Sequence, residues 1–303
     1  EGMDRTHNPE FTILELYVSY KDYNWMMEMT EQLLEKVSID STGNTKVKVG
    51  DNTIDFKAPY ERITIYDAIK KFTGIDISNM DESMLRNTAK NLNIEIDDTM
   101  GKGKLIDSIF GDKCEPNFIQ PTFIMDYPKE MSPLTKVHRQ NKDLTERFEL
   151  IVNGKEIANA YSELNDPIDQ KERFEKQLEL SKKGDQEAGE FIDYDFLRAL
   201  EYGMTPTSGI GFGIDRLVML MTDNLSIQEV IFFPQMRPEK KKISMNESEK
   251  LVYENISKEN QLIGVIKDKI EISNKAWDKA CLLYTSDAAD DLLCVDLGGR
   301  RII

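Results

Sequence analysis

Apolar and polar residues alternate along residues 9–20, where the sequence reads PEFTILELYVSY. This alternation, rich in β-branched and aromatic residues, predicts a strand whose side chains point to opposite faces in turn. One face would carry the residues typical of a packed core, Thr12, Leu14, Leu16 and Val18. The other face would carry Phe11, Ile13, Glu15, Tyr17 and Ser19. Its carboxylate and phenol among apolar neighbours make this strand a candidate for chemistry.

Several other segments repeat their apolar residues at helical spacing. The clearest is DYNWMMEMTEQLLEKV at 22–37, which predicts an amphipathic helix packed on the core through Trp25, Met26, Met29, Leu33, Leu34 and Val37. Shorter patterns predict a helix within 64–78 that ends at Gly74, a polar helix over 166–184 that ends at Gly184, and a helix within 193–204. The segment 246–280 predicts two more helices.

Two segments have the pattern of a β-hairpin. GNTKVKVGDNTIDF at 43–56 is the first, and ERFELIVNGKEIANAYSEL at 146–164 is the clearer one. Asn153-Gly154 in the second is typical of a two-residue type I′ turn. That turn predicts a register in which Val152 faces Lys155, Ile151 faces Glu156 and Glu149 faces Ala158.

A glycine-rich stretch, TSGIGFGIDRLVMLMTD at 207–223, predicts a strand followed by a helix with Asp215 as its N-cap and Arg216 in its first turn. Gly209, Gly211 and Gly213 leave one strand face without side chains, which would admit a flat ring or a second backbone. Tight packing explains this pattern at least as well. The next segment, NLSIQEVIFFPQMRP at 224–238, predicts a further strand.

Composition limits the class of protein. With 40% apolar and 31% charged residues, the 303-residue chain is typical of a soluble globular protein, and it contains no apolar run that would cross a membrane. Its three cysteines, Cys114, Cys281 and Cys294, have neither metal-site spacing nor a disulfide framework, so a reducing cytoplasm is expected. A net charge of -16 argues against a chain whose surface binds nucleic acid over most of its area, but it does not exclude a local basic patch.

The two ends of the chain suggest a fragment. The sequence starts with Glu1 instead of methionine and enters its first strand within a few residues. Residues 281–303, CLLYTSDAADDLLCVDLGGRRII, lack the Lys/Glu/Asn-rich texture of the preceding sequence. We therefore expect sequence upstream of Glu1 to be missing and the last 23 residues to be a non-native tail.

The second hairpin offers candidate metal ligands. In the predicted register Glu149 and Glu156 are diagonal neighbours about 5–8 Å apart at Cβ. They would either both face solvent or share Mg²⁺, which accepts one or two carboxylates alongside phosphate oxygens. Strict alternation puts Asn159, Tyr161 and Glu163 on the opposite face. A bulge or bend near residues 157–159 would be needed for both sets to line one site.

The remaining polar candidates are fewer. Arg216 suits a phosphate as well as a surface ion pair. His7 and Asn8 precede the first strand in a segment typical of an exposed turn. The only two histidines, His7 and His138, have no partner at metal-ligand or triad spacing. The sequence therefore gives no support for a zinc site or for nucleophilic catalysis that depends on histidine.

Three segments taken together resemble the class II lysyl-tRNA synthetases over residues 1–239: EGMDRTHNPEFTILELY, LTERFELIVNGKEIANAYSELNDP and GMTPTSGIGFGIDRLVMLMTDNLSIQEVIFFPQMRP. The resemblance implies an α+β fold, an antiparallel sheet flanked by helices, in a homodimer. It divides the chain into a partial catalytic domain at 1–240 with a mostly helical insertion at 38–121, a helical extension at 241–280 and the tail at 281–303. It also implies joining of lysine to ATP as lysyl-adenylate and transfer of lysine to the 3′ end of tRNA.

The resemblance also implies roles for individual residues. Catalysis would involve Glu1, His7 and Arg216. ATP would be bound by Glu1, His7, Asn8, Phe11, Glu149 and Arg216, with Phe11 on the adenine and Arg216 on the γ-phosphate. Mg²⁺ would be held by Glu149 and Glu156. Lysine would be bound by Glu15, Tyr17, Asn159, Tyr161 and Glu163.

Elementary chemistry supports this transfer of roles. An ammonium group that leaves water needs carboxylates close to it, and Glu15 and Glu163 would supply them. Aspartyl relatives would need a positive pocket instead. The substrate carboxylate itself attacks the α-phosphate, so alignment and charge neutralisation would carry the catalysis. This explains why the sequence has no evident nucleophile or histidine base.

The chain departs from the family pattern in three respects. The arginine that the family places two positions before Glu1 is absent, motif 1 and the anticodon-binding OB domain are absent, and Tyr161 stands where many relatives have phenylalanine. We therefore expect the chain alone to be inactive. Two alternatives remain, a lysyl ligase for elongation factor P and a non-catalytic paralogue. The long segment 38–121 argues against the ligase, and the retention of Glu149, Glu156 and Arg216 argues against the paralogue.

Overall fold

The computed structural model describes residues 3–182, 189 and 191–235. These residues belong to one compact unit, Glu1–Arg237. Glu1, Gly184, the predicted extension at 241–280 and the predicted tail at 281–303 lie outside the described residues. None of the described helices has the length and apolarity that a membrane crossing requires.

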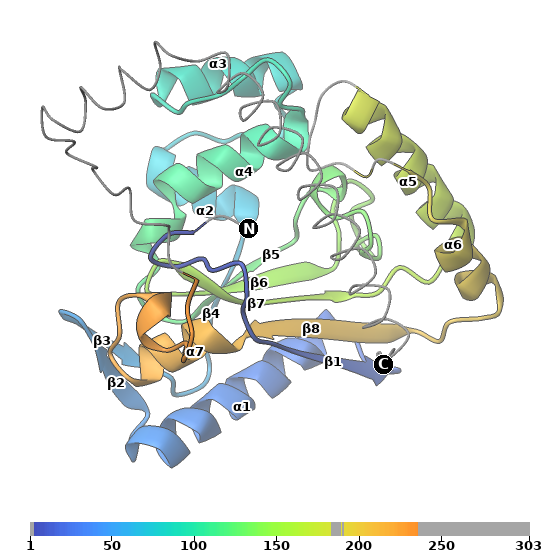
Figure 1. The fold of residues 1–303 in the computed structure, drawn as a ribbon. Coiled ribbons are helices and arrows are strands. Elements are labelled where there is room, and N and C mark those ends of the chain that lie inside the picture. Colours follow the sequence, from blue (N-terminus) through green and yellow to red (C-terminus); the bar gives the residue numbers. More distant parts are fainter. Residues whose placement is uncertain (1–2, 183–188, 190, 236–303) are drawn as a thin grey trace, which may run out of the picture. The chain divides into compact units, whose positions relative to one another are not determined.

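A six-stranded mixed sheet organises the unit (Figure 1). The strands follow the order β1-β8-β7-β6-β5-β4, with bounds β1 Ile13–Ser19, β8 Thr207–Gly213, β7 Lys155–Ser162, β6 Arg147–Val152, β5 Thr122–Met125 and β4 Glu61–Thr64. Neighbouring strands are antiparallel except β4 and β5, which are parallel. The flanking helices make this an α+β arrangement, which confirms the predicted fold class.

Helix α1, Tyr23–Thr42, packs along one face of the sheet (Figure 1). Asp22 is its N-cap, because its carboxylate accepts hydrogen bonds from the backbone N–H groups of Asn24 and Trp25. Met26, Met27 and Leu34 are fully buried against the sheet. Helix α7, Ile214–Met221, and the separate hairpin of β2, Lys46–Val49, and β3, Asn52–Asp55, complete the same core.

Among the described residues, the helices that pack on the opposite face cover its β4–β6 end. Helices α2, Ile65–Thr73, α3, Glu82–Asn91, and α4, Lys102–Lys113, form a second core there with Ile124 and Ile151 of the sheet. Gly74 ends α2 in the left-handed conformation, as predicted. Neither core cluster takes residues of β1, β8 or β7 from this face. The uncovered part of the sheet is therefore available to polar side chains.

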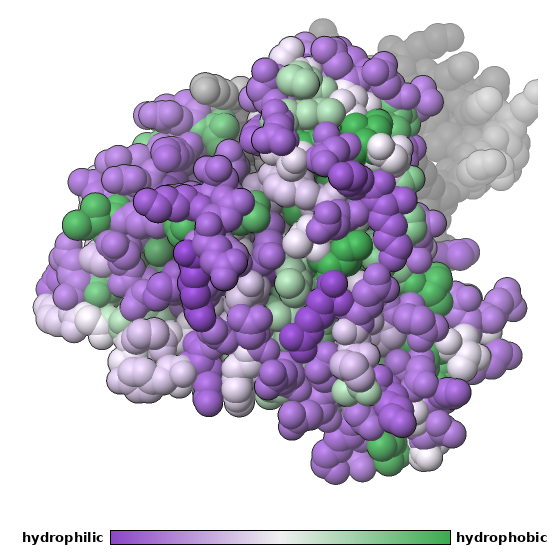
Figure 2. Space-filling model, turned by 180° about the vertical axis from the view of Figure 1, so that it is seen from behind, coloured by the Kyte–Doolittle hydropathy of each residue, from purple (hydrophilic) through white to green (hydrophobic). Residues whose placement is uncertain are grey.

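The segment 38–121 contributes more than an appendage of helices. Its strand β4 forms the outer strand of the main sheet, and its helices provide most of the second core. Further along the chain, α5, Pro167–Lys182, and α6, Tyr194–Glu201, pack on each other through Phe174 and Phe196. Figure 2 shows one face of the molecule, on which hydrophilic residues dominate and apolar residues form only small groups.

Three sequence predictions about local structure are wrong. Residues 224–235 form no strand: the segment contains a 3-10 turn, Ile227–Glu229, held by a capping box between Ser226 and Glu229. Asp215 is not the N-cap of α7, because the helix begins after Gly213. The Asp215 carboxylate instead accepts the backbone N–H of Thr12 at 2.6 Å, which ties α7 to the entry of β1.

Leu14 is the third of these errors. It was predicted to be a core residue but is 43% exposed. Strand β1 is the outermost strand of the described sheet, and only Leu16 and Val18 of its core face reach the cluster that α1 covers.

Candidate functional site

A bulge in the β6–β7 hairpin decides which side chains meet. Asn153 and Gly154 both have positive φ, +52° and +68°, as a type I′ turn requires. Val152 pairs with Lys155 and Ile151 with Glu156, as predicted, but Leu150 pairs with Ala158. Ile157 is therefore the extra residue of a bulge, and Glu149 faces Asn159 instead of the predicted Ala158. The bulge brings Glu156 onto the same face as Asn159 and Tyr161.

Cross-strand registers arrange the predicted residues in two rows. Glu15, Gly211, Asn159 and Glu149 are opposite one another across β1, β8, β7 and β6. The adjacent row consists of Tyr17, Gly209, Tyr161 and Arg147. In both rows a glycine of β8 lies between side chains contributed by β1 and β7. The strand face without side chains thus becomes a gap flanked by polar groups.

Close packing fills the gap at Gly209. A Cβ atom at this position would lie 2.2 Å from Glu163 Oε1 and 2.7 Å from the ring of Tyr17. Any larger residue would displace both groups, since real Cβ contacts below 3.0 Å essentially do not occur. Glu15 lies opposite Gly211 in the adjacent row, and its charge acts on Glu163. We call Glu15, Tyr17 and Glu163 the acidic cluster.

Burial and nearby negative charge raise the pKa values of two members of the acidic cluster, Glu163 and Tyr17. Burial, followed by the charge of Glu15, raises the pKa of Glu163 to about 7. Burial and the same two carboxylates raise the pKa of Tyr17. The Tyr17 hydroxyl lies 3.5 Å from Glu15 Oε2, and no salt bridge joins either glutamate to a cation among the described residues. A bound cation would relieve this repulsion.

A cavity of about 280 Å³ lies beside the first row, between the entry to β1 and the start of α7. We call it the His7 cavity; its lining includes His7, Asn8, Phe11, Glu156, Asn159, Gly211, Gly213 and Arg216. Most of the predicted ATP-binding residues therefore converge, although Glu1 lies outside the described residues and Glu149 does not line this cavity. Phe11 is half exposed.

A chain of hydrogen bonds fixes the cationic end of this cavity. Asp4 accepts from Nδ1 of His7 at 2.8 Å, and Nε2 of His7 lies 3.0 Å from the guanidinium of Arg216. Because a guanidinium only donates, Nε2 is the acceptor and the proton of the neutral ring sits on Nδ1. Hydrogen bonds from Thr6 and His7 lower the pKa of Asp4. Arg216 also donates to the carbonyl oxygen of Glu156 at 2.8 Å.

Asn8 has an unsatisfied acceptor in the same cavity. Its side-chain amide donates to the carbonyl of Glu10 at 2.6 Å, whereas its Oδ1 is buried without a partner. A buried polar atom without a partner costs free energy. A ligand with a hydroxyl or amino group would satisfy it.

Arg147 is a site residue that the sequence analysis missed. It pairs with Glu149 at 2.5 Å, donates to Asn159 Oδ1 at 3.2 Å and lies over the ring of Tyr127 at 4.5 Å. It thus holds two of the predicted ligand-binding side chains. A signal was available, because Arg147 is two residues before Glu149 and period two places both on one strand face.

Glu149 and Glu156 interact electrostatically. Burial and the charge of Glu149 raise the pKa of Glu156, against the lowering effects of Arg147 and Arg216. Two carboxylates on one face suit a hard cation that takes its other ligands from phosphates and water. The described residues contain no group of three or more His, Cys, Asp or Glu side chains that could hold a metal by themselves.

The mixed, mostly antiparallel sheet, the Arg216 end of the His7 cavity and the acidic cluster agree with the features expected of a class II aminoacyl-tRNA synthetase domain. A family model described as "tRNA synthetases class II (D, K and N)" matches residues 1–237, and the chain belongs to this family.

Three relatives with high sequence identity are all named for one amino acid, lysine. The chain is similar to proteins named lysine–tRNA ligase: 63% identical to that of Christiangramia forsetii over 281 residues, which are 92% of this chain and 49% of that protein. It is 70% identical to that of Porphyromonas gingivalis over 240 residues, 79% of this chain and 41% of that protein. It is 67% identical to that of Azobacteroides pseudotrichonymphae over 240 residues, which are 79% of this chain and 48% of that protein. The chain therefore spans about half the length of the curated relatives it matches.

Proposed function

We propose that the complete protein carrying this chain is a lysine–tRNA ligase, which activates lysine with ATP and transfers it to the 3′ end of tRNA. The single observation that supports lysine most directly is the acidic cluster. Glu15 lies on β1 opposite Gly211, and Glu163 follows β7 directly and lies against Gly209. The two carboxylates interact electrostatically and lack a cationic partner among the described residues. An ammonium group would pair with both, whereas an aspartate side chain would be repelled.

ATP would occupy the His7 cavity. Arg216 would contact a terminal phosphate, with its guanidinium oriented by His7 and by the carbonyl of Glu156. Phe11, half exposed at the cavity wall, would stack on the adenine. Asn8 would use its unpartnered Oδ1 to accept from the nucleotide.

Mg²⁺ would be held by Glu149 and Glu156 together with phosphate oxygens. The raised pKa of Glu156 supports this assignment, because a dication would remove the repulsion between the two carboxylates. The ion would neutralise charge on the phosphates. Arg147 would keep Glu149 and Asn159 in place.

Lysine would be bound along the two rows of the sheet. Its ammonium would lie near Glu15 and Glu163, and the two tyrosine rings, Tyr17 and Tyr161, would flank its methylene chain. Asn159, in the row of Glu15, would contact the amino acid closer to the nucleotide. Attack of the lysine carboxylate on the α-phosphate forms a carboxyl–phosphate bond and releases pyrophosphate; this step depends on alignment more than on proton transfer. We also propose a cytoplasmic homodimer, as the family resemblance implies.

Amino-acid-dependent exchange of pyrophosphate into ATP tests this proposal. The complete protein should exchange with lysine and not with aspartate or asparagine, the other two amino acids of the family. Glu163→Gln should lower kcat/KM for lysine by about 10²-fold, because it leaves Glu15 as the sole carboxylate near the ammonium. Exchange with aspartate or asparagine instead of lysine would disprove the assignment. Transfer to a protein acceptor but not to tRNA would favour the elongation factor P ligase.

A further inference from the structure

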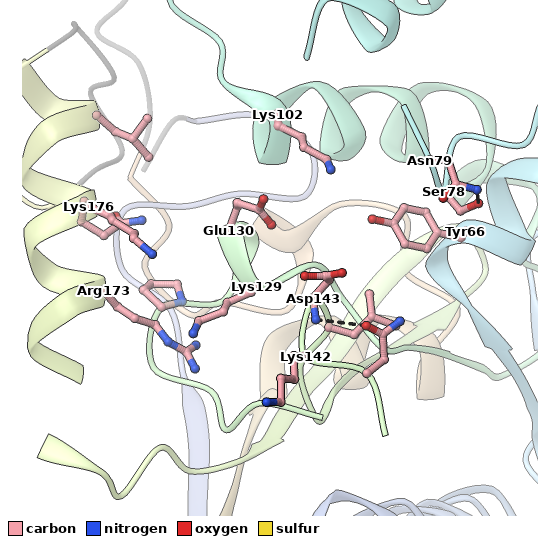
Figure 3. A pocket seen from close by; sticks show the side chains of 15 residues that line it. Tyr66, Ser78, Asn79, Lys102, Lys129, Glu130, Lys142, Asp143, Arg173 and Lys176 are labelled. Carbon is pink, nitrogen blue, oxygen red and sulfur yellow. Dashed lines mark hydrogen bonds between the residues drawn. The ribbon is translucent and has the colours of Figure 1, made fainter. Parts of the chain in front are cut away.

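A second cavity, of about 610 Å³, lies apart from the His7 cavity, between α5, the start of α4 and the segment 128–144 (Figure 3). We call it the basic cavity, because five cationic residues line it against two acidic ones. The cations are Lys102, Lys129, Lys142, Arg173 and Lys176, and the acidic residues are Glu130 and Asp143. In a chain of net charge -16 such a concentration of positive charge needs an explanation.

Two of the cations have a structural role. Arg173 is buried, pairs with Asp169 at 2.9 Å and donates to the carbonyl of Ser132 at 2.9 Å. Lys129 pairs with the same carboxylate at 3.1 Å. These bonds lower the pKa of Asp169 and join α5 to the segment 128–133. They build one wall of the cavity, and the single carboxylate of Asp169 offsets part of the charge of both residues.

The other three cations remain available. Lys102, Lys142 and Lys176 form no salt bridge with any acidic residue of the described chain at the distances that define the other pairs. They come from three separate elements, α4, the loop before β6 and α5, and Figure 3 shows all three around the same hollow. Three ammonium groups that converge without partners attract a ligand with several negative charges.

The basic cavity continues toward the catalytic face. A neighbouring cavity of about 450 Å³ shares Lys102, Glu130 and Pro133 with it and is also lined by Arg147. Arg147 contacts both Glu149 and Asn159 of the proposed active site. A chain of hollows therefore leads from the three free lysines to the residue that positions the catalytic side chains.

We infer that the basic cavity binds backbone phosphates of the single-stranded 3′ end of tRNA on its way to the aminoacyl group; this inference rests on the proposed function. ATP is accounted for by the His7 cavity, so the remaining phosphate-bearing substrate is the nucleic acid. Positive charge along a groove together with an aromatic surface is the combination that binds single strands. Tyr66, half-buried in the wall opposite α5, supplies the aromatic ring.

Charge reversal at exposed lysines tests the inference in the complete protein. Lys142→Glu and Lys176→Glu should each reduce kcat/KM for tRNA in aminoacylation by about tenfold and decrease the slope of log(kcat/KM) against log[salt] by roughly 0.7. Lysine-dependent pyrophosphate exchange should stay within twofold. Lys171→Glu is the matched control: Lys171 is also exposed on α5, does not line the cavity, and should leave both activities unchanged.

A shortened substrate identifies the part of tRNA involved. Binding of tRNA without its unpaired 3′ end should be weaker and insensitive to Lys142→Glu, whereas intact tRNA should be sensitive. Equal sensitivity of both RNAs would place another part of tRNA in the cavity and overturn the inference. It would also be overturned by unchanged aminoacylation, or by an equal loss of exchange, which would assign the cavity to the activation step. Absence of lysine-dependent exchange in the unsubstituted protein would instead refute the proposed function.

Discussion

Gly209 lies where any side chain would collide with two residues of the acidic cluster. Its neighbour Gly211 is less constrained, because a Cβ there would meet only the flexible end of Ile13 at 3.1 Å. The difference arises from position: Gly209 is in the row of Tyr17, and Glu163 folds over it. Single residues thus determine the shape of the proposed lysine site.

Gly209→Ala should raise the KM for lysine by tenfold or more, because the new methyl group would push Glu163 and Tyr17 away from their positions. Pyrophosphate exchange at varied lysine concentration measures this effect. Gly111→Ala in helix α4 serves as the control, since its Cβ would lie 4.0 Å from the nearest atom, Glu115 Oε2. An unchanged KM for lysine in Gly209→Ala would show that the acidic cluster does not contact the substrate.

The pKa of Glu163, raised to about 7, predicts a pH dependence of lysine binding. Below this pH the carboxyl is mostly protonated and no longer attracts an ammonium group. The KM for lysine should therefore rise by about fivefold to tenfold between pH 8 and pH 6. In Glu163→Gln the KM should be higher but nearly independent of pH over this range, and a persistent pH dependence would assign it to another group.

The same shift affects stability with a defined sign. The pKa of Glu163 in the folded chain, about 7, exceeds its ordinary value of 4.5. The free energy of unfolding that protonation of Glu163 contributes is therefore fully present below pH 4.5 and is lost as pH rises through 7. The difference in free energy of unfolding between Glu163→Gln and the parent should thus shift in favour of the variant by on the order of 1–3 kcal/mol from pH 5 to pH 8. Urea unfolding at the two pH values measures it. Glu201→Gln, at an exposed position of α6, should show no such gain.

At the scale of elements, the β6–β7 hairpin determines whether Glu149 and Glu156 share one face of the sheet with Asn159 and Tyr161. The type I′ turn fixes the register at Val152 and Lys155, and the bulge at Ile157 then shifts it by one residue. Without that shift Asn159 and Tyr161 would point into the core under α1. Ile157 itself is buried in that core, so apolar burial of the extra residue stabilises the bulge.

Gly154→Ala should destabilise the hairpin by about 1–3 kcal/mol, because Gly154 has φ +68° and a Cβ would lie 3.1 Å from Pro116 Cα. Denaturant unfolding gives the change in free energy. Gly111→Ala, in a helix with ordinary backbone angles, should be neutral or slightly stabilising. A neutral Gly154→Ala would contradict the strained-turn explanation.

At the scale of the whole described unit, one sheet separates two apolar cores. Neighbouring residues of β5, Phe123 and Ile124, belong to different cores, and so do Leu150 and Ile151 of β6. Because these strands supply side chains to both, loss of one core removes support from the other. The two layers should unfold together.

Ile106→Ala in the α2–α4 core tests this coupling with Trp25 of the α1 core as reporter. Ile106 is fully buried, so the substitution should cost about 2–5 kcal/mol. Trp277→Phe in the background leaves Trp25 as the single tryptophan. The unfolding transitions followed by Trp25 fluorescence and by far-UV circular dichroism should both shift to the same lower denaturant midpoint. A Trp25 transition that stays at the parent's midpoint would mean that the cores unfold independently.

Local pattern did not predict β4 and β5, nor α3 and α4 as separate helices. It was enough for the other six strands of the described chain, for α1, α2, α5, α6 and α7, for the type I′ turn and for the acidic candidate residues. These features depend on alternation, helical spacing and turn chemistry, which a short segment contains in full. It was also enough to state that a bulge near residues 157–159 would have to exist if both sets of side chains were to meet. Local pattern failed at 224–235, where apolar residues predicted a strand but a capping box produces a turn.

Only the tertiary structure decided which candidates come together. The bulge at Ile157, the position of Glu163 over Gly209 and the link from Asp4 through His7 to Arg216 join segments up to 209 residues apart in the chain. Arg147 was identified as a site residue through its partners on β6 and β7, although its spacing from Glu149 already placed it on the same strand face. The basic cavity likewise draws its free lysines from three elements whose separation in sequence gives no indication of contact. Sequence pattern specifies what each segment becomes, whereas packing of the segments determines the distances on which charge and chemistry depend.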